Sequence, residues 1–360
     1  MKRKTKKSKF KKILVSIIAF IVISAVVVMP VVAAIVYESI FSYRFEPEEW
    51  MAFVPEDFPG LQQECCQFES MDGATLAGYK YSRENPDDES TPAGVVVIAH
   101  GLGGGGQSLY MNVADFFTKN NYLVFAYDAT GNGESEGDDV RGLPQGVRDL
   151  CSALDYVKIQ PEYGALPIML FGHSWGAYSS GAVLEYHPDI SAVVMVSGFN
   201  ESADMLEQES VATVGPVARL TLPYVYLYEK IKFGKFSQTS AVKGFQKSSA
   251  DVMIIHSEDD TDVLIENGYN IFYEKFGDSE RFTFIKYENR GHSYVYCSEK
   301  SSAARQYLNE KYAEYVEANG GKYTSEIKAE FMEANMDRLV CFELDNDLMQ
   351  RILDFYNSNS

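Results

Sequence analysis

The sequence predicts an α/β fold, in which the strands of a sheet alternate with helices. Short apolar, β-branched runs recur along the chain and are separated by stretches of helical periodicity. One of these runs, 168–171, leads directly into a Gly-x-Ser-x-Gly segment at 172–176, and small residues follow. This context is typical of a strand that turns sharply into a helix with the serine at the apex. A functional site is therefore expected where this strand ends.

Ser174 is the candidate nucleophile of that site. Gly172 and Gly176 carry no side chains, so strand and helix can pass close together and hold the hydroxyl at the carboxyl edge of the sheet. The Trp175 amide is expected at the N-terminus of the helix, where a developing oxyanion would be stabilised. His173, inside the same segment, is expected to pack or to line the pocket rather than to react.

Three histidines follow Ser174 and compete for the role of general base. A serine hydroxyl needs a base, oriented by a carboxylate, and in this architecture the chain order is serine, acid, histidine. His187 is expected to end a helix in solvent, and His256 closes an apolar run before any acid candidate. His292 lies in a polar, glycine-containing loop after a strand. We therefore expect His292 to be the base.

The acid is expected in the loop that follows the preceding strand. That loop, 257–262, carries four carboxylates in six residues, and most of them are expected to be solvated. Asp259, Asp260 and Asp262 remain open as candidates.

A second oxyanion donor is expected from an earlier loop. Residues 94–106 read as a buried strand followed by His-Gly and a glycine run, whose backbone can approach a substrate closely. The amide of Leu102 is the expected donor, and His100 is expected to be structural. The competing phosphate-binding loop is disfavoured because neither Gly-Lys-Ser/Thr nor a correctly placed Gly-x-Gly-x-x-Gly with a ribose-binding acid occurs.

Taken together, these motifs resemble the α/β-hydrolase superfamily, and within it the serine aminopeptidase and monoacylglycerol-lipase-like branch. The resemblance covers roughly residues 60–300 and implies a mainly parallel, eight-stranded sheet with helices on both faces. It also implies Asp260 as the triad acid, because the family pattern His-Gly-x-x-Asp-x-x-Val falls on His256, Ser257, Asp260 and Val263. The matching segments are 68–82, 95–104, 122–137, 168–177, 252–263 and 290–293.

The chain departs from the family pattern at two positions of the 127–135 loop. Thr130 stands where an arginine is common, and Asn132 stands where a histidine is frequent. Neither position touches the expected nucleophile, base or acid, so the departures weaken only a subfamily assignment.

The resemblance further implies a helical cap formed by an insertion at about 199–250. Leu220, Leu222 and Tyr224 are candidates to line an acyl or aromatic pocket there, although they can equally pack the cap onto the body. A helical extension follows at about 299–360, and its last helix, after the N-cap candidate Asp345, is expected to pack against the sheet edge.

The N-terminus predicts a membrane anchor. A basic flank at 1–12 precedes an apolar run at 13–37 that is long enough to cross a hydrocarbon core. The flank is expected in the cytoplasm and the α/β-hydrolase domain, 38–360, outside the cell. The alternative is secretion after signal cleavage, but the run exceeds the usual length of about 7–15 apolar residues.

The composition limits which partners and cofactors are expected. The formal net charge of −19 argues against nucleic acid, whose phosphates such a surface would repel. The five cysteines are scattered and show no metal-ligand spacing, so neither a metal nor a cofactor is expected, although one or two disulfides stay open.

The expected chemistry is that of a serine hydrolase acting on a small-molecule carboxylic ester through an acyl-enzyme. Three alternatives remain: an amide or peptide hydrolase, an acyltransferase, and a non-catalytic binding protein. The oligomeric state is not predicted by any pattern in the sequence.

Overall fold

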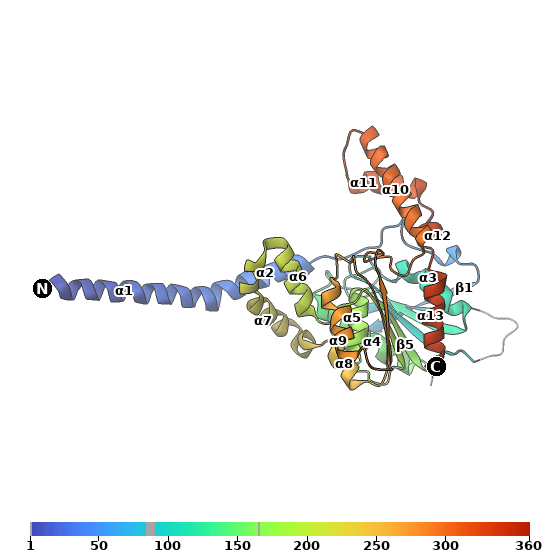
Figure 1. Cartoon of the computed structure of the whole chain (residues 1–360), viewed down its shortest axis with the longest axis horizontal. Helices are drawn as coiled ribbons and strands as arrows, with labels where there is room; N and C mark the ends of the chain where they lie inside the picture. Colours follow the sequence, from blue (N-terminus) through green and yellow to red (C-terminus); the bar gives the residue numbers. More distant parts are fainter. Residues whose placement is uncertain (1, 84–90, 165) are drawn as a thin grey trace.

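An eight-stranded sheet forms the centre of the molecule, with helices on both faces (Figure 1). The computed structural model describes residues 2–83, 91–164 and 166–360. The strand order is β1-β2-β4-β3-β5-β6-β7-β8, and all neighbours from β4 to β8 pair in parallel, whereas β1, β2 and β4 pair antiparallel. The expected mainly parallel, eight-stranded sheet is therefore confirmed. The strands are β1 (Leu61–Glu69), β2 (Thr75–Arg83), β3 (Gly94–Ala99), β4 (Tyr122–Tyr127), β5 (Ile168–His173), β6 (Ala192–Val196), β7 (Asp251–Ser257) and β8 (Phe282–Tyr287).

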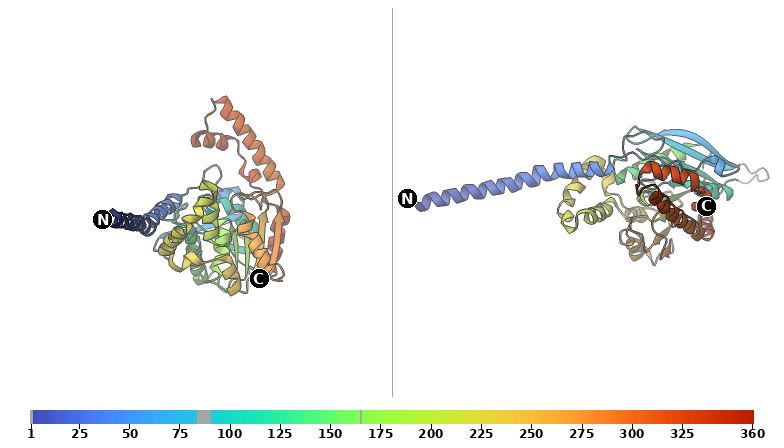
Figure 2. Two further views of the ribbon diagram at one scale, coloured as in Figure 1. Left: turned by 60° about the vertical axis from the view of Figure 1, so that its left-hand side comes forward. Right: turned by 90° about the horizontal axis from the view of Figure 1, so that it is seen from above.

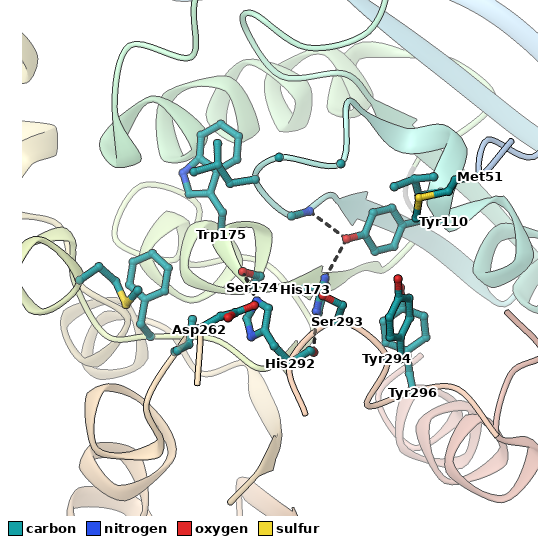
Figure 3. A pocket seen from close by; sticks show the side chains of 18 of the residues that line it. Met51, Tyr110, His173, Ser174, Trp175, Asp262, His292, Ser293, Tyr294 and Tyr296 are labelled. Carbon is teal, nitrogen blue, oxygen red and sulfur yellow. Dashed lines mark hydrogen bonds between the residues drawn. The ribbon is translucent and has the colours of Figure 1, made fainter. Parts of the chain in front are cut away.

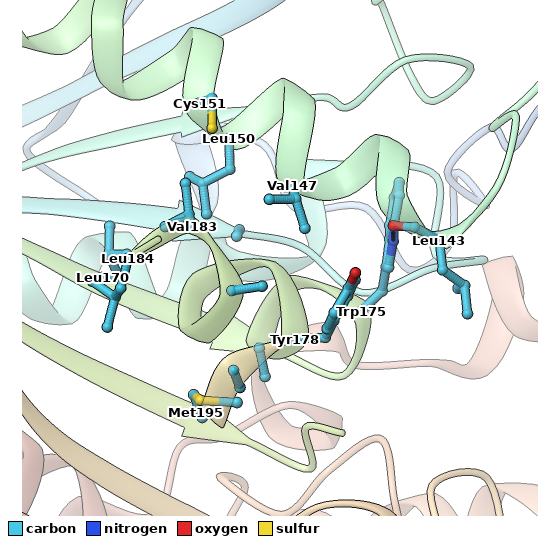
Figure 4. Packing of buried hydrophobic residues seen from close by; sticks show 14 of the residues in the cluster. Leu143, Val147, Leu150, Cys151, Leu170, Trp175, Tyr178, Val183, Leu184 and Met195 are labelled. Atoms are coloured by element: carbon cyan, nitrogen blue, oxygen red, sulfur yellow. Dashed lines mark hydrogen bonds between the residues drawn. The ribbon is translucent and has the colours of Figure 1, made fainter. Parts of the chain in front are cut away.

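The central strands are apolar on both faces because helices cover both. Val95 and Val97 of β3 belong to one hydrophobic cluster, and Val96 and Ile98 belong to the other. One face carries α4 (Leu143–Ile159), α5 (Trp175–Val183), α8 (Ala241–Lys247) and α9 (Tyr269–Phe276), and the other carries α3 (Met111–Lys119) and α13 (Asn346–Asn357). Figure 4 shows α4 and α5 packed together over the sheet.

The last helix, α13, covers the middle of the sheet and not its edge, so that expectation was wrong. Asp345 caps the helix as predicted, because its side chain accepts hydrogen bonds from the amides of Asp347 and Leu348. The fully buried Tyr356 donates its hydroxyl to the Leu170 carbonyl of β5 at 2.7 Å. The apolar face of α13 is thus part of the core.

The segment between β6 and β7 is helical, as expected for a cap. It contains α6 (Ser202–Val214), a 3₁₀ turn at Pro216–Leu220, α7 (Leu222–Phe233) and a second 3₁₀ turn at Gly234–Gln238. The following α8 packs so closely on α5 that a Cβ at Gly244 would overlap the Gly181 carbonyl oxygen. This last helix therefore belongs to the body of the fold.

The N-terminal segment is one long helix that projects from the body (Figures 1 and 2). It comprises α1 (Lys2–Ile23), a π-helical turn at Ser24–Val28 and α2 (Met29–Phe41). The stretch Lys9–Phe41 is long and apolar enough to cross a membrane, with a mean hydropathy of 2.9 in its most apolar window. It continues past residue 37, and its end packs against α7 of the cap.

The contact between α2 and the cap is specific. Ala33, Tyr37 and Phe41 recur every four residues, and all three are buried. Tyr37 donates its hydroxyl to Glu229 Oε1 at 2.9 Å, and Ser202 donates to the same oxygen at 2.6 Å. Because burial penalises the charged form, the pKa of Glu229 is raised to about 7.

The C-terminal extension contains α10 (Glu299–Ala318), α11 (Ser325–Asn335), α12 (Arg338–Cys341) and α13. The antiparallel pair α10–α11 projects from the body (Figure 1). All five cysteines are free, and Cys151 is fully buried in α4.

The buried Glu229 predicts a pH-dependent stability. Its pKa in the folded chain lies above the ordinary 4.5. Its contribution to the free energy of unfolding is therefore fully present below about pH 4.5 and is lost as the pH rises through about 7. The loss is on the order of 3 kcal/mol. In detergent micelles, Glu229→Gln should flatten the dependence of Tm on pH between 5 and 8, whereas Glu209→Gln, an exposed control on α6, should not. An unchanged slope in Glu229→Gln would contradict this assignment.

Candidate active site

A strained turn between β5 and α5 carries Ser174. Its backbone adopts φ 55° and ψ −117°, a region that non-glycine residues avoid. The neighbouring glycines make the turn feasible: a Cβ at Gly172 would overlap the Gly176 backbone, and one at Gly176 would overlap the Ala99 carbonyl. The turn therefore brings Ser174 against the end of β3 as well as the end of β5.

His292 lies between Ser174 and Asp260. Its Nδ1 donates to Asp260 Oδ2 at 2.8 Å, and Ser174 Oγ donates to its Nε2 at 2.8 Å. Asp260 follows β7, and His292 follows β8, so both side chains come from loops at the carboxyl edge of the sheet. Figure 3 shows the side chains of Ser174 and His292 next to one another at the cavity.

Asp260 is held as a buried carboxylate. Burial alone would raise its pKa, but hydrogen bonds from His256 and His292 lower it well below the usual range. Its other oxygen, Oδ1, accepts from the amides of Asp262 and Val263. Three hydrogen-bond donors thus surround a side chain that is 2 % exposed, and His256 Nε2 lies 3.3 Å from Oδ2.

The other two acid candidates have different contacts. Asp259 Oδ1 accepts from Ser257 Oγ and from the Gly291 amide, which ties the loop of His292 to β7. Asp262 is exposed and lines the mouth of the cavity. Among the three, Asp260 is the one whose carboxylate contacts His292.

The two expected oxyanion residues line the same cavity as Ser174. Trp175 is the first residue of α5, and its indole Nε1 donates to the Leu143 carbonyl at 2.7 Å. Leu102 lies in the glycine-rich loop after β3.

His173 stands behind His292 and joins two loops of the site. Because the His292 carbonyl can only accept, His173 Nε2 carries the proton and donates to it at 3.2 Å. Nδ1 of the neutral ring therefore accepts from the Tyr110 hydroxyl at 2.8 Å, and that hydroxyl accepts from the Gly101 amide at 3.0 Å. Burial lowers the pKa of His173 to about 3, so the ring stays neutral. The network positions the backbone of both loops.

The cavity over Ser174 has a volume of about 420 Å³. Its walls are mainly apolar and come from the segment before β1, the loop after β3, the cap and the C-terminal extension. The apolar and aromatic lining residues include Met51, Leu109, Tyr110, Leu143, Phe199, Met205, Val263, Tyr294, Tyr296 and Phe342.

The pocket residues predicted on the cap were wrong. Leu220 is 73 % exposed, Leu222 is buried inside the cap, and Tyr224 packs against the core; none of them lines the cavity. The reason is that α7 packs on α2, whereas α6 and the segment before it supply Met205 and Phe199 to the cavity.

The remaining histidines have structural contacts. His187 is buried beside Lys158, so the expected solvated position was wrong. His256 is fully buried at the end of β7 and donates from Nε2 to the Val263 carbonyl. His100 accepts from the Ala129 amide at 2.9 Å, as expected for a structural residue.

Thr130, which replaces the common arginine, binds the buried Asp149. Its amide and its hydroxyl both donate to that carboxylate, and burial raises the pKa of Asp149 to about 6. In the described part of the chain, no group of three or more metal-ligating side chains gathers.

Comparisons with known proteins place this chain near serine hydrolases. The family profile described as "Serine aminopeptidase, S33" matches residues 90–258. Monoglyceride lipase of Rattus norvegicus is 30% identical over 165 residues, 45% of this chain and 51% of that protein. Monoglyceride lipase of Mus musculus is 32% identical over 138 residues, 38% of this chain and 43% of that protein. The chain thus spans about half or less of the curated relatives it matches.

Solved structures share the fold at low sequence identity. The Pyrococcus furiosus esterase Pf2001 is 18% identical, with a TM-score of 0.53 over 76% of this chain and 98% of that chain. An acylaminoacyl peptidase in complex with a chloromethyl ketone is 19% identical, with a TM-score of 0.51 over 76% of this chain and 44% of that chain.

The Tyr110 hydroxyl is expected to support the site without reacting. In Tyr110→Phe the buried Gly101 amide loses its hydrogen-bond acceptor, which lowers the free energy of unfolding by about 1–3 kcal/mol. His173, which contacts the His292 backbone, also loses its hydrogen bond from Tyr110. If the site hydrolyses esters, kcat should fall about tenfold with little change in KM. Steady-state kinetics on a p-nitrophenyl ester measures this, with the exposed Tyr273→Phe as control. Full activity in Tyr110→Phe would exclude a positioning role.

Proposed function

Because the chain belongs to the α/β-hydrolase superfamily, and to its branch similar to serine aminopeptidases and monoglyceride lipases, we propose that it is a membrane-anchored serine hydrolase of carboxylic esters. The observation that carries the proposal is the position of His292, within 2.8 Å of both Ser174 and Asp260. That arrangement is what nucleophilic catalysis by serine requires.

In the proposed reaction, Ser174 Oγ attacks the acyl carbonyl while His292 Nε2 takes its proton. Asp260 holds the Nδ1 proton and stabilises the imidazolium. The amides of Trp175 and Leu102 bind the oxyanion of the tetrahedral intermediate. His292 then protonates the leaving alcohol, and a water molecule that it activates hydrolyses the acyl-enzyme. No step calls for a metal or cofactor.

An ester is the favoured substrate because the curated relatives with the matching segments are named as lipases and because the walls of the cavity are mainly apolar. An amide or short peptide is the second candidate, since the matching family profile is described as a serine aminopeptidase. The acyltransferase and binding-protein alternatives have no observation of their own in their favour.

Membrane anchoring through the helix Lys9–Phe41 is supported by its length and apolar composition. The basic flank favours a cytoplasmic N-terminus and a catalytic domain outside. Retention is favoured over cleavage because Ala33, Tyr37 and Phe41 are buried against the cap. Cleavage before residue 38 would leave Glu229 without its Tyr37 partner.

The catalytic assignment predicts a graded loss of activity. Full-length enzyme in detergent micelles should release p-nitrophenol from p-nitrophenyl dodecanoate with a burst equal to the enzyme present. Ser174→Ala and His292→Ala should abolish the burst, and Asp260→Asn should lower kcat by about 10⁴-fold. Glu258→Gln, an exposed acid in the same loop, should retain the activity of the wild type.

Two comparisons test the substrate class. Faster turnover of an aminoacyl p-nitroanilide than of the ester would shift the proposal to the amide hydrolase. Transfer to an added alcohol in preference to water would identify an acyltransferase. A folded wild type that turns over none of these substrates would contradict the enzyme proposal.

The anchor predicts that the intact chain stays with the membrane. After an alkaline carbonate wash, the pellet should hold protein whose mass includes residues 1–37. On intact cells, an impermeant maleimide should label the exposed Cys65, and Cys65→Ser should reduce the labelling. Recovery of a soluble chain that begins after residue 30 would instead identify a cleaved signal sequence.

A further inference from the structure

A second cavity adjoins the one over Ser174. It measures about 780 Å³ and shares Met51, Tyr294 and Phe342 with the first. Its floor is the loop of His292, and its walls are α10, α11 and the segment around Trp50. Figure 3 shows that Met51 and Tyr294 lie on the side of the catalytic cavity away from Trp175. The two cavities thus meet beside the loop that carries His292.

Two cations of this second cavity have no acidic partner in the part of the chain that the structure describes. Arg305 donates to Ser301 Oγ and the Cys341 carbonyl, and its guanidinium lies 3.8 Å from the centre of the Tyr294 ring. Lys328 is exposed, and its Nζ lies 5.3 Å from the centre of the Trp50 ring.

The other charges of the groove cancel these two only in part. Arg290 is neutralised by Asp345, at 2.7 Å, and stacks on Tyr287. Glu310 on α10 lines the groove and contributes one negative charge, which accepts a hydrogen bond from Gln306 at 3.1 Å. Two cations, Arg305 and Lys328, against this one carboxylate leave the groove with a net charge of +1.

We propose that this groove binds the leaving alcohol of the ester, an inference that rests on the proposed function. This alcohol carries an anionic group, a phosphate or a carboxylate. The leaving oxygen receives its proton from His292, so the alcohol departs on the side of that residue. Tyr294 is two residues from His292 and lines both cavities. An anionic group on that alcohol would reach the cations of the groove through the part of the cavity that Met51, Tyr294 and Phe342 line in common.

Lys328 is the sharper residue to test, because Arg305 also joins α10 to α12 and its loss would affect folding. The control is Lys311, an exposed lysine on α10 that pairs with Glu314 at 2.7 Å and does not line the groove. Lys328→Arg keeps the charge and serves as the conservative variant.

The experiment uses full-length enzyme in neutral detergent micelles and three esters with the same dodecanoyl group. The alcohols are glycerol, glycerol 3-phosphate and glyceric acid, and the readout is kcat/KM from dodecanoate release. Wild type should prefer at least one anionic ester by about tenfold, and Lys328→Glu should abolish that preference while leaving the glycerol ester within about twofold. Lys328→Arg and Lys311→Glu should behave like wild type, and salt should weaken the preference. The favoured anion distinguishes phosphate from carboxylate.

Other outcomes overturn the proposal in separable ways. Turnover of the glycerol ester with no preference for either anion, or an equal effect of Lys328→Glu on all three esters, overturns the leaving-group assignment alone. Failure of wild type to hydrolyse any ester overturns this inference together with the proposed ester hydrolase.

Discussion

The contact between the Gly176 backbone and the end of β3 is the constraint on which the rest of the site depends. No side chain fits there, because a Cβ would overlap the Ala99 carbonyl. The contact brings the N-terminus of α5 against the loop that carries Leu102, and it holds Ser174 at φ 55° between them. Nucleophile and both expected oxyanion donors therefore come from one junction, and the strain of about 1–3 kcal/mol is offset by the buried packing around it. Substitution of Gly176 would separate all three.

Around this junction the loops are positioned by buried polar contacts. Asp260 is surrounded by donors, so it stays ionised, and His173 stays neutral and joins the loops of Gly101 and His292. The N-terminal helix contributes in the same way at longer range. Tyr37 binds Glu229 on α7, and Glu229 binds Ser202 at the start of α6, which in turn lines the cavity with Met205. The end of this apolar helix is thus part of the packing of the cap.

Local patterns predicted the α/β fold and singled out Ser174 and His292, and the family resemblance singled out Asp260 within the acidic loop, but packing between distant segments could not be predicted. Ser174, Asp260 and His292 each follow a strand in a short motif, so chain order alone brings them to one edge of the sheet. The cavity walls depend on tertiary contacts: Met51 and Phe342 lie almost 300 residues apart and carry no motif. Leu220 and Leu222 were misplaced because α7 packs on α2, so that Leu222 is buried inside the cap and Leu220, in the turn before α7, is exposed. The burial of His187 was not predicted either, because the sequence at a helix end does not show which side chains of other segments will cover it.

Covalent labelling by a fluorophosphonate is the most direct test that Ser174 is an activated nucleophile, because the reagent reacts with an activated serine whatever the substrate is. Full-length protein in detergent micelles would be labelled, digested and mapped by mass spectrometry. We expect one label, on Ser174, and we expect His292→Ala to remove it although that variant retains Ser174. Absence of label on a folded wild type, or a label on another residue, would contradict this assignment.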